Sequence, residues 1–263
     1  MGFVVLVILS LVVSSVGWHK FVWFISLGYG FSVAAIGVAL LVMYGAGANP
    51  VSIVQAVLFV VYGLRLGGYL LARERRSAAY NKLMKDQVND GSGLGKPVQA
   101  VVWASVAVLY ACEASPVLFR MQAGAAADVA CVIGAVLQLG GIVLESAADL
   151  QKSAQKKVNP RRFCDKGLYS FVRCPNYLGE VLNWTGVFVS GVTVAAGVWQ
   201  WLAMLVGWLG IVYIMFGGAR RLEIRQNRNY GADPEYQRYV KSVPILLPWV
   251  PLYSVEKYTW LKG

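Results

Sequence analysis

Tyrosine and arginine side chains recur along one otherwise uncharged segment, at a spacing that suits proton transfer to a bound molecule. Tyr62, Arg65, Tyr69 and Arg73 follow one another at intervals of three or four residues, which places them along one side of a helix. A phenol beside a guanidinium can donate a hydrogen bond or a proton to a substrate oxygen. Tyr62 is therefore our candidate catalytic residue. The alternative for Tyr69 and Arg73 is that they are anchors at a lipid–water boundary.

A second cluster combines two acids with a run of bases. Glu145 and Asp149 are four residues apart, so both carboxylates lie on one helix face, and Lys152 and Lys156 follow. Like charges at this spacing repel each other unless a third group bridges them. Ribose hydroxyls or an amide could form that bridge, while the lysines meet phosphates. The alternative is that nearby cations pair with both carboxylates.

The third cluster surrounds a predicted helix start. Pro175 suits the first turn of a helix, where its missing N–H is no loss. Asn176 and Glu180, four residues apart, would then share one helix face, and Arg173 would lie at the helix N-terminus. Such a position favours anions. A carboxylate such as Glu180 inside an apolar segment is costly unless a partner or ligand compensates it.

The elements that must position these clusters are long apolar segments. The chain has 263 residues and is 57% hydrophobic and only 14% charged, whereas a soluble domain is about one quarter charged. A helix of about 20 apolar residues crosses a bilayer. The candidate segments are Gly2 to Trp18, Phe21 to Tyr44, Val51 to Ala72, Val98 to Phe119, Val129 to Ala148, Tyr177 to Val192 and Val194 to Phe216. The sequence predicts an all-α polytopic integral membrane protein of about seven transmembrane helices, with 1–263 as a single domain.

The positions of the basic residues predict the orientation in the membrane. Three stretches, Arg73 to Lys96, Lys152 to Arg173 and Arg220 to Lys262, hold six, seven and eight of the 24 Lys and Arg residues. Counted over seven spans, all three fall on one side, which the positive-inside rule makes cytoplasmic. The N-terminus is then outside and the C-terminus cytoplasmic. The basic excess fits anionic lipid headgroups or an anionic cofactor.

Other classes of partner are excluded by the same counts. The formal net charge of +11 lies in a mostly apolar chain, so we expect membrane lipids and a lipidic small molecule as partners, and no nucleic acid. The four cysteines show no CxxC spacing, so we expect neither a disulfide framework nor a metal site. The expected location is the plasma membrane or the endoplasmic reticulum.

The second half of the chain resembles a known family. The run from Glu145 through Arg173-Cys-Pro-Asn-Tyr-Leu-Gly-Glu180, with Tyr230-Gly, Tyr236 and Tyr239, looks like the steroid 5-alpha-reductase C-terminal family. Within that family it is most similar to the DUF1295 branch of bacterial-type membrane proteins. The resemblance implies an NADPH-dependent reductase of an activated carbon-carbon double bond in a steroid, sterol or polyprenoid-like lipid.

The resemblance also implies that different parts of the chain bind the substrate and the cofactor. Residues 1–120 would supply the helices of a substrate cavity, with Tyr62 polarising the substrate ketone, and 125–263 would form the cofactor-binding half. The expected cofactor-binding residues are Arg73, Glu145, Asp149, Lys152, Lys156, Arg173, Asn176, Tyr177, Glu180, Arg221, Glu223 and Tyr236.

The chain departs from the family pattern at two places. Steroid reductases of this family carry an acid in an early span, but no Asp or Glu precedes Glu74 here, and Cys174 replaces the His of an Arg-His-Pro motif. That motif also marks S-adenosylmethionine-dependent methyltransferases of the isoprenylcysteine and phospholipid type, which are the alternative. Methyltransferases of this type usually have an Arg followed by two adjacent Glu residues near the C-terminus. At the corresponding place this chain has a single Glu, Glu223. A non-catalytic lipid binder is a third reading.

Overall fold

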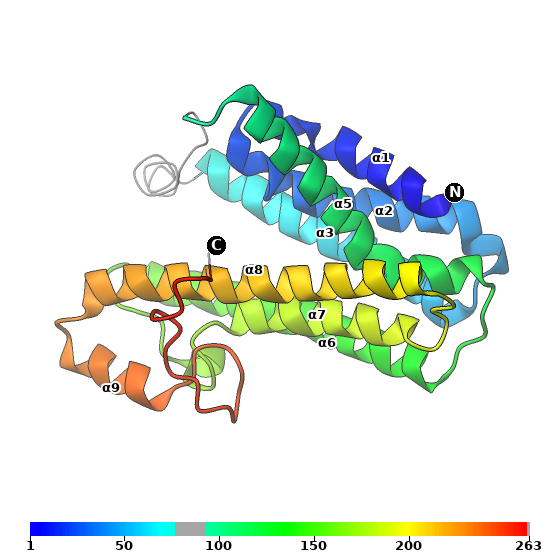
Figure 1. The fold of residues 1–263 in the computed structure, drawn as a ribbon. Helices are drawn as coiled ribbons and strands as arrows, with labels where there is room; N and C mark the ends of the chain where they lie inside the picture. The colour runs from blue at the N-terminus through cyan, green and yellow to red at the C-terminus, as the bar shows by residue number, and fades with distance from the viewer. Residues whose placement is uncertain (77–92, 262–263) are drawn as a thin grey trace. The chain divides into compact units, whose positions relative to one another are not determined.

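The fold is built from helices joined by loops. A computed structural model describes residues 1–76 and 93–261, and within these ranges it contains no β-strand (Figure 1). The helices are α1 (Gly2–Ser14), α2 (Leu27–Tyr44), α3 (Pro50–Arg76), α5 (Lys96–Gln122), α6 (Val129–Val158), α7 (Pro175–Gly191), α8 (Val198–Tyr230) and α9 (Pro234–Ser242), with short 3-10 turns at Ser15–Trp18, Phe21–Phe24, Gly45–Gly47 and Gly167–Ser170. The predicted all-α class is confirmed.

Five of the described segments are long and apolar enough to cross a membrane. They are Phe21–Gly47, Pro50–Arg75, Lys96–Gln122, Val129–Val158 and Val198–Tyr230. Helices α1 and α7 have 13 and 17 residues, shorter than the roughly 20 that span the hydrocarbon core. The length and apolar composition of these helices identify an integral membrane protein. The count of seven spans and the orientation remain predictions.

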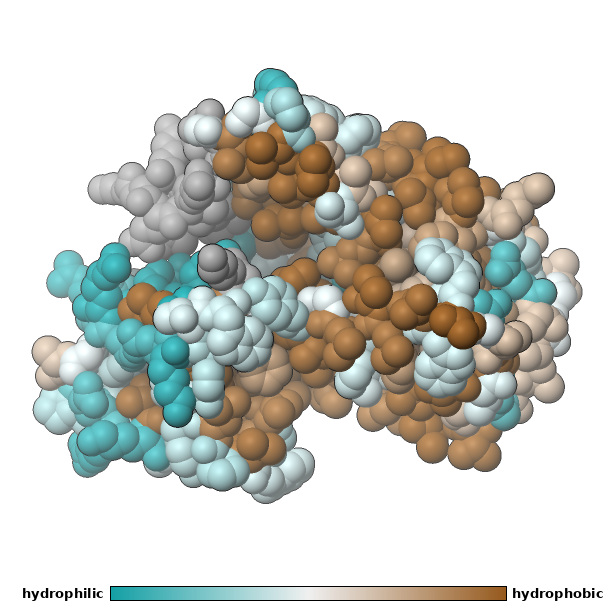
Figure 2. Space-filling view, viewed as in Figure 1, coloured by the Kyte–Doolittle hydropathy of each residue, from teal (hydrophilic) through white to brown (hydrophobic). Residues whose placement is uncertain are grey.

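Helices α6 and α8 are longer than a span requires. They have 30 and 33 residues, which at 1.5 Å per residue is about 45 to 50 Å, against about 30 Å of hydrocarbon. Each begins apolar and ends in charged residues, so their ends extend beyond the hydrocarbon region. Figure 2 shows hydrophilic side chains gathered over α9 and the end of α8 that leads to it.

The chain divides into two compact units, and α6, α7 and α8 each contribute to both. The first unit contains Met1–Ala135 and Val187–Trp208, and the second contains Val136–Gly186 and Leu209–Gly263. In the first unit, α2 and α3 touch through glycines. A Cβ atom added to Gly63 would lie 2.3 Å from the backbone oxygen of Gly30. Small residues allow such close packing, which stabilises helix pairs in lipid.

A buried arginine ties together three chain segments of the first unit. Arg120 is fully buried near the end of α5. Its Nε donates a 2.7 Å hydrogen bond to the carbonyl oxygen of Ser190, and its Nη2 lies 2.9 Å from a carboxylate oxygen of Asp128. Thr193 donates to the same carboxylate at 2.6 Å. A buried guanidinium is tolerated because acceptors surround it.

In the second unit, α6 and α7 also cross at glycines. A Cβ atom on Gly141 would lie 2.4 Å from the backbone nitrogen of Asn183, and one on Gly179 would lie 2.7 Å from that of Glu145. The chain after α9 then folds back onto the helices. Its buried residues Ile245 and Leu246 pack with residues of α7 and α8. This returning segment forms one wall of the candidate site.

We predict that Asp128 gives the first unit a measurable acid sensitivity. The hydrogen bond from Thr193, and then the contacts with Cys131 and Arg120, lower the pKa of Asp128 from 3.8 to about 2. Because the folded-state pKa lies below the unfolded value, this contribution to stability is present above about pH 4 and lost as the pH falls toward 2. Asp128→Asn should remove this acid-dependent part and destabilise the protein at neutral pH by about 1 kcal/mol, since the carboxylate is partly exposed.

The measurement is the melting temperature of the detergent-solubilised protein as a function of pH. Asp233→Asn is the matched control, because Asp233 is a helix N-cap and Asn caps a helix equally well. Identical pH profiles for Asp128→Asn and the unmodified protein would show that the carboxylate does not stabilise the fold.

Candidate functional site

A buried ion pair in the second unit links Arg173, two residues before α7, to the charged half of α8. Arg173 and Glu223 are each 2% exposed, and Arg173 Nη2 lies 2.8 Å from Glu223 Oε1. The other carboxylate oxygen accepts a 2.8 Å hydrogen bond from the backbone N–H of Val255. Arg173 also donates to the backbone oxygen of Tyr253. The pair therefore joins α7, α8 and the returning C-terminal segment.

A second set of hydrogen bonds extends from this pair toward α9. Tyr236 is fully buried and donates a 2.7 Å hydrogen bond to Asn227 Oδ1, and Asn227 Nδ2 donates to Glu256 at 2.7 Å. Burial raises the pKa of Tyr236 to about 12, although Arg173 acts in the opposite direction. The phenol therefore stays protonated at neutral pH and remains a hydrogen-bond donor.

The N-terminus of α7 is less open to anions than we expected. The backbone N–H groups of Arg173 and Cys174 donate to the carbonyl oxygens of Pro244 and Ile245 at 2.9 and 3.0 Å. The charge of Arg173 is matched by Glu223. Burial raises the pKa of the Cys174 thiol to about 12, so Cys174 is a neutral packing group.

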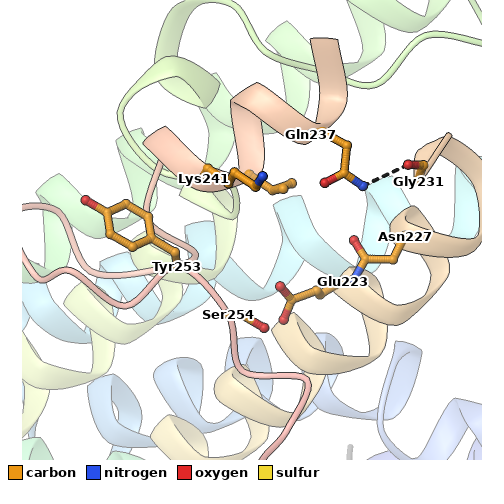
Figure 3. A pocket seen from close by; sticks show the side chains of 8 residues that line it. Glu223, Asn227, Gly231, Gln237, Lys241, Tyr253 and Ser254 are labelled. Atoms are coloured by element: carbon orange, nitrogen blue, oxygen red, sulfur yellow. Dashed lines mark hydrogen bonds between the residues drawn. The ribbon is translucent and has the colours of Figure 1, made fainter. Parts of the chain in front are cut away.

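Beside the ion pair lies a cavity of about 490 Å³. Figure 3 shows Glu223 and Asn227 of α8 and Gln237 and Lys241 of α9 around a common space. The full lining is Glu223, Asn227, Gly231, Gln237, Val240, Lys241, Tyr253 and Ser254. A carboxylate, two amides, an ammonium group and a hydroxyl suit a polar ligand that carries hydroxyl and anionic groups.

Sequence reasoning found only Glu223 among these lining residues. Asn227 was missed although it follows Glu223 by four residues, so that both lie on one face of α8. Lys241 was counted only as part of a basic stretch. Tyr253 and Ser254 carried no usable signal, because they come from an irregular segment whose path depends on tertiary contacts.

Two predicted carboxylates are buried where α6 and α7 cross. Glu145 and Glu180 are 6% and 4% exposed, and Trp184 Nε1 donates a 3.0 Å hydrogen bond to Glu180. Asn183, fully buried, lies on the same helix as Glu180. Polar groups at this depth need compensation by protein or ligand, so this crossing is the second polar region of the unit.

The remaining predicted residues of the second unit take different positions. Asp149 and Lys152 are half-buried further along α6 and lie within electrostatic range of each other. Asn176 and Tyr177 are half-buried in the first turn of α7, and Arg221 is exposed on α8.

Lys156 has a structural role that the sequence did not reveal. Its ammonium group donates to the carbonyl oxygens of Arg162 and Pro160 at 2.6 and 3.1 Å, and to the hydroxyl of Tyr230 at 3.1 Å. These contacts fold the loop after α6 against the end of α8. Most of the donor capacity of this lysine is already used.

Tyr62 and Arg73 belong to the first unit. Tyr62 is fully buried, and its hydroxyl lies 3.3 Å from that of Tyr29. The guanidinium of Arg65 lies 5.7 Å from the Tyr62 ring, and that of Arg73 lies 5.4 Å from the Tyr69 ring. The sequence correctly grouped the tyrosines with the arginines but did not identify Tyr29.

Comparison with known proteins gives one match. A model of the family described as "Protein of unknown function (DUF1295)" matches residues 11–243. No curated protein and no solved structure matches the chain.

We predict that charge neutralisation at Glu223 destabilises the protein far more than at an exposed pair. Glu223→Gln keeps the shape but leaves the Arg173 charge buried without a counter-ion, which should cost about 3 kcal/mol. Glu235→Gln is the control: Glu235 pairs with Arg162 with its side chain 54% exposed, so the loss should stay below about 1 kcal/mol. Unfolding of the purified protein by denaturant measures both.

The double variant Arg173→Met with Glu223→Leu separates charge from packing. The double variant should be more stable than Glu223→Gln, because it removes both buried charges together. Equal and small losses in Glu223→Gln and Glu235→Gln would contradict the central role of the ion pair.

Proposed function

Since the chain belongs to the DUF1295 family of proteins of unknown function, we propose that it is an NADPH-dependent membrane reductase. Its substrate would be a steroid, sterol or polyprenoid-like lipid, in which it would reduce an activated carbon-carbon double bond. The observation that carries the proposal is a cavity of about 490 Å³ between α8, α9 and the C-terminal segment, with an ammonium group, two amides and a hydroxyl in its lining. That size lies in the range of about 300 to 1,000 Å³ typical of small-molecule sites.

The lining of the cavity fits part of a dinucleotide. The Gln237 amide and the Ser254 hydroxyl can bind ribose hydroxyls, and the Lys241 ammonium group can bind a phosphate. When bound, NADPH would supply a hydride. The buried polar residues of α6 and α7, including Glu180, would hold the other polar groups of the cofactor.

Tyr62 would assist at the substrate oxygen. The buried phenol of Tyr62 donates a hydrogen bond to the hydroxyl of Tyr29, which orients it. The nearby Arg65 favours any negative charge that develops on the phenol oxygen. The first carboxylate of the chain, Glu74, cannot stand in for the early acid of related reductases, because it is engaged by Lys20 and by Trp23 Nε1, the latter at 2.8 Å. The proposal therefore assigns the electrophilic role to the hydroxyl of Tyr62.

The first test is cofactor binding to the purified protein. A ligand of the native state raises its stability by about 2.7 kcal/mol at 100 times its dissociation constant, so NADPH should raise the melting temperature. Asn176→Ala and Glu180→Ala should each weaken NADPH binding about tenfold, or about 1.4 kcal/mol. Lys241→Ala should weaken it too, while Arg238→Ala, an exposed basic residue of α9 outside the cavity lining, should not.

Three outcomes separate the alternatives. Stabilisation by S-adenosylmethionine and not by NADPH would replace the reductase with a methyltransferase. Stabilisation by neither would leave a lipid binder without this chemistry. Normal NADPH affinity in all three variants would remove these residues from the site.

The second test isolates the hydroxyl of Tyr62. Tyr62→Phe should lower the turnover number by a factor of about 10² to 10⁴ on any substrate that the unmodified protein reduces. NADPH affinity and stability should change little. Tyr110→Phe is the matched control, because the hydroxyl of Tyr110 donates to the backbone oxygen of Phe24 and the proposal gives it no part in the chemistry. Equal turnover in Tyr62→Phe and the unmodified protein would show that Tyr62 is a packing residue.

A further inference from the structure

The segment after α9 contains a long uncharged stretch inside the most basic part of the chain. Residues 243–255 carry no charge, although eight Lys and Arg residues lie between Arg220 and Lys262. The middle of this stretch reads Leu247-Pro248-Trp249-Val250-Pro251. Turns exposed to water are usually polar, so an apolar tip here needs a different environment.

The root of this loop is fixed to the helices. The backbone N–H of Ile245 donates a 2.9 Å hydrogen bond to the oxygen of Leu252, which closes the loop at its neck. Ile245 and Leu246 are 1% and 0% exposed. The loop is therefore a closed structure on a rigid support, and its tip has a defined position.

The tip presents a tryptophan that the described residues leave uncovered. The Trp249 side chain is 97% exposed, and that of Val250 is 43% exposed. The backbone of Trp249 has φ of 62°, a conformation that side chains other than glycine rarely adopt. Such strain persists only where the surrounding structure imposes it.

Two contacts place this segment beside the apolar part of the helices. The core beneath the loop includes Val181 of α7 and Phe216 of α8, both in predicted membrane segments. Further along, the hydroxyl of Tyr213 donates a 2.8 Å hydrogen bond to the backbone oxygen of Trp260, and their rings stack at 6.2 Å. Figure 1 shows the chain turning back from α9 toward α8. The tip therefore lies near the level where α8 changes from apolar to charged.

We propose that residues 247–251 are an interfacial membrane anchor, with the Trp249 ring inserted between lipid headgroups and acyl chains. Tryptophan prefers this layer because its ring is apolar and its N–H is polar. The occupant of the exposed surface is the bilayer that surrounds the spanning helices. Trp260, which is 63% exposed, extends the same belt.

The anchor would also hold one wall of the cavity in place. Tyr253 and Ser254 line the cavity and follow the tip directly. The backbone oxygen of Tyr253 accepts a hydrogen bond from Arg173. The loop and the ion pair therefore both constrain this short segment of the backbone. The anchor does not depend on the identity of the ligand.

Site-directed labelling in lipid nanodiscs tests the anchor. The four native cysteines are all buried, so single Trp249→Cys, Val250→Cys and Lys257→Cys variants can each carry one spin label. In nanodiscs of phosphatidylcholine and phosphatidylglycerol, we expect labels at 249 and 250 to be about tenfold less accessible to an aqueous nickel chelate than the label at 257. Labels at 249 and 250 should stay accessible to oxygen, which partitions into lipid.

Two results would overturn the anchor. Aqueous accessibility at 249 and 250 equal to that at 257 would place the tip in water. Protection from both reagents would place it against protein, such as a second copy of the chain.

Trp249→Gly provides a second readout that needs no label. Glycine accepts the backbone angle, so the variant should fold with an unchanged or higher melting temperature in detergent. In nanodiscs with brominated lipids, the quenched share of tryptophan fluorescence should fall relative to the unmodified protein. A lower melting temperature in detergent would mean that the ring packs within the protein, and unchanged quenching would mean that it does not reach lipid.

Discussion

The buried ion pair between Arg173 and Glu223 is the interaction on which the second unit depends. A guanidinium and a carboxylate at 2% exposure each are costly to bury, and further hydrogen-bond partners offset part of that cost. Those partners are backbone groups of Tyr253 and Val255, so satisfying the charges requires the C-terminal segment to return to α8. The same segment supplies Tyr253 and Ser254 to the cavity wall.

A similar solution recurs in the first unit, with different partners. Arg120 is fully buried and satisfied by the backbone oxygen of Ser190 and the carboxylate of Asp128. In both units an arginine near a helix end gathers carbonyl and carboxylate oxygens from distant segments. Arginine suits this role because its guanidinium always carries charge and presents several donors in fixed directions.

The position of the cavity follows from the lengths of the helices. Helices α6 and α8 extend beyond the hydrocarbon region, so polar side chains such as Asn227 and Lys241 can gather on α8 and α9 at little desolvation cost. The same boundary gives the Trp249 tip a layer to occupy. Membrane depth therefore separates the cavity beside α9, the buried polar crossing of α6 with α7, and the proposed anchor within one unit.

The sequence by itself determined the helical class, the membrane character and the family, because hydropathy, spacing and a local motif are properties of contiguous residues. It also indicated that Glu180 lies inside an apolar segment and needs a compensating partner, and the structure buries this residue. Only the tertiary structure decided that Arg173 pairs with Glu223, 50 residues away, and that Lys156 folds a loop. The choice among many carboxylates and carbonyls depends on which distant segments pack together, and that packing is a property of the whole chain.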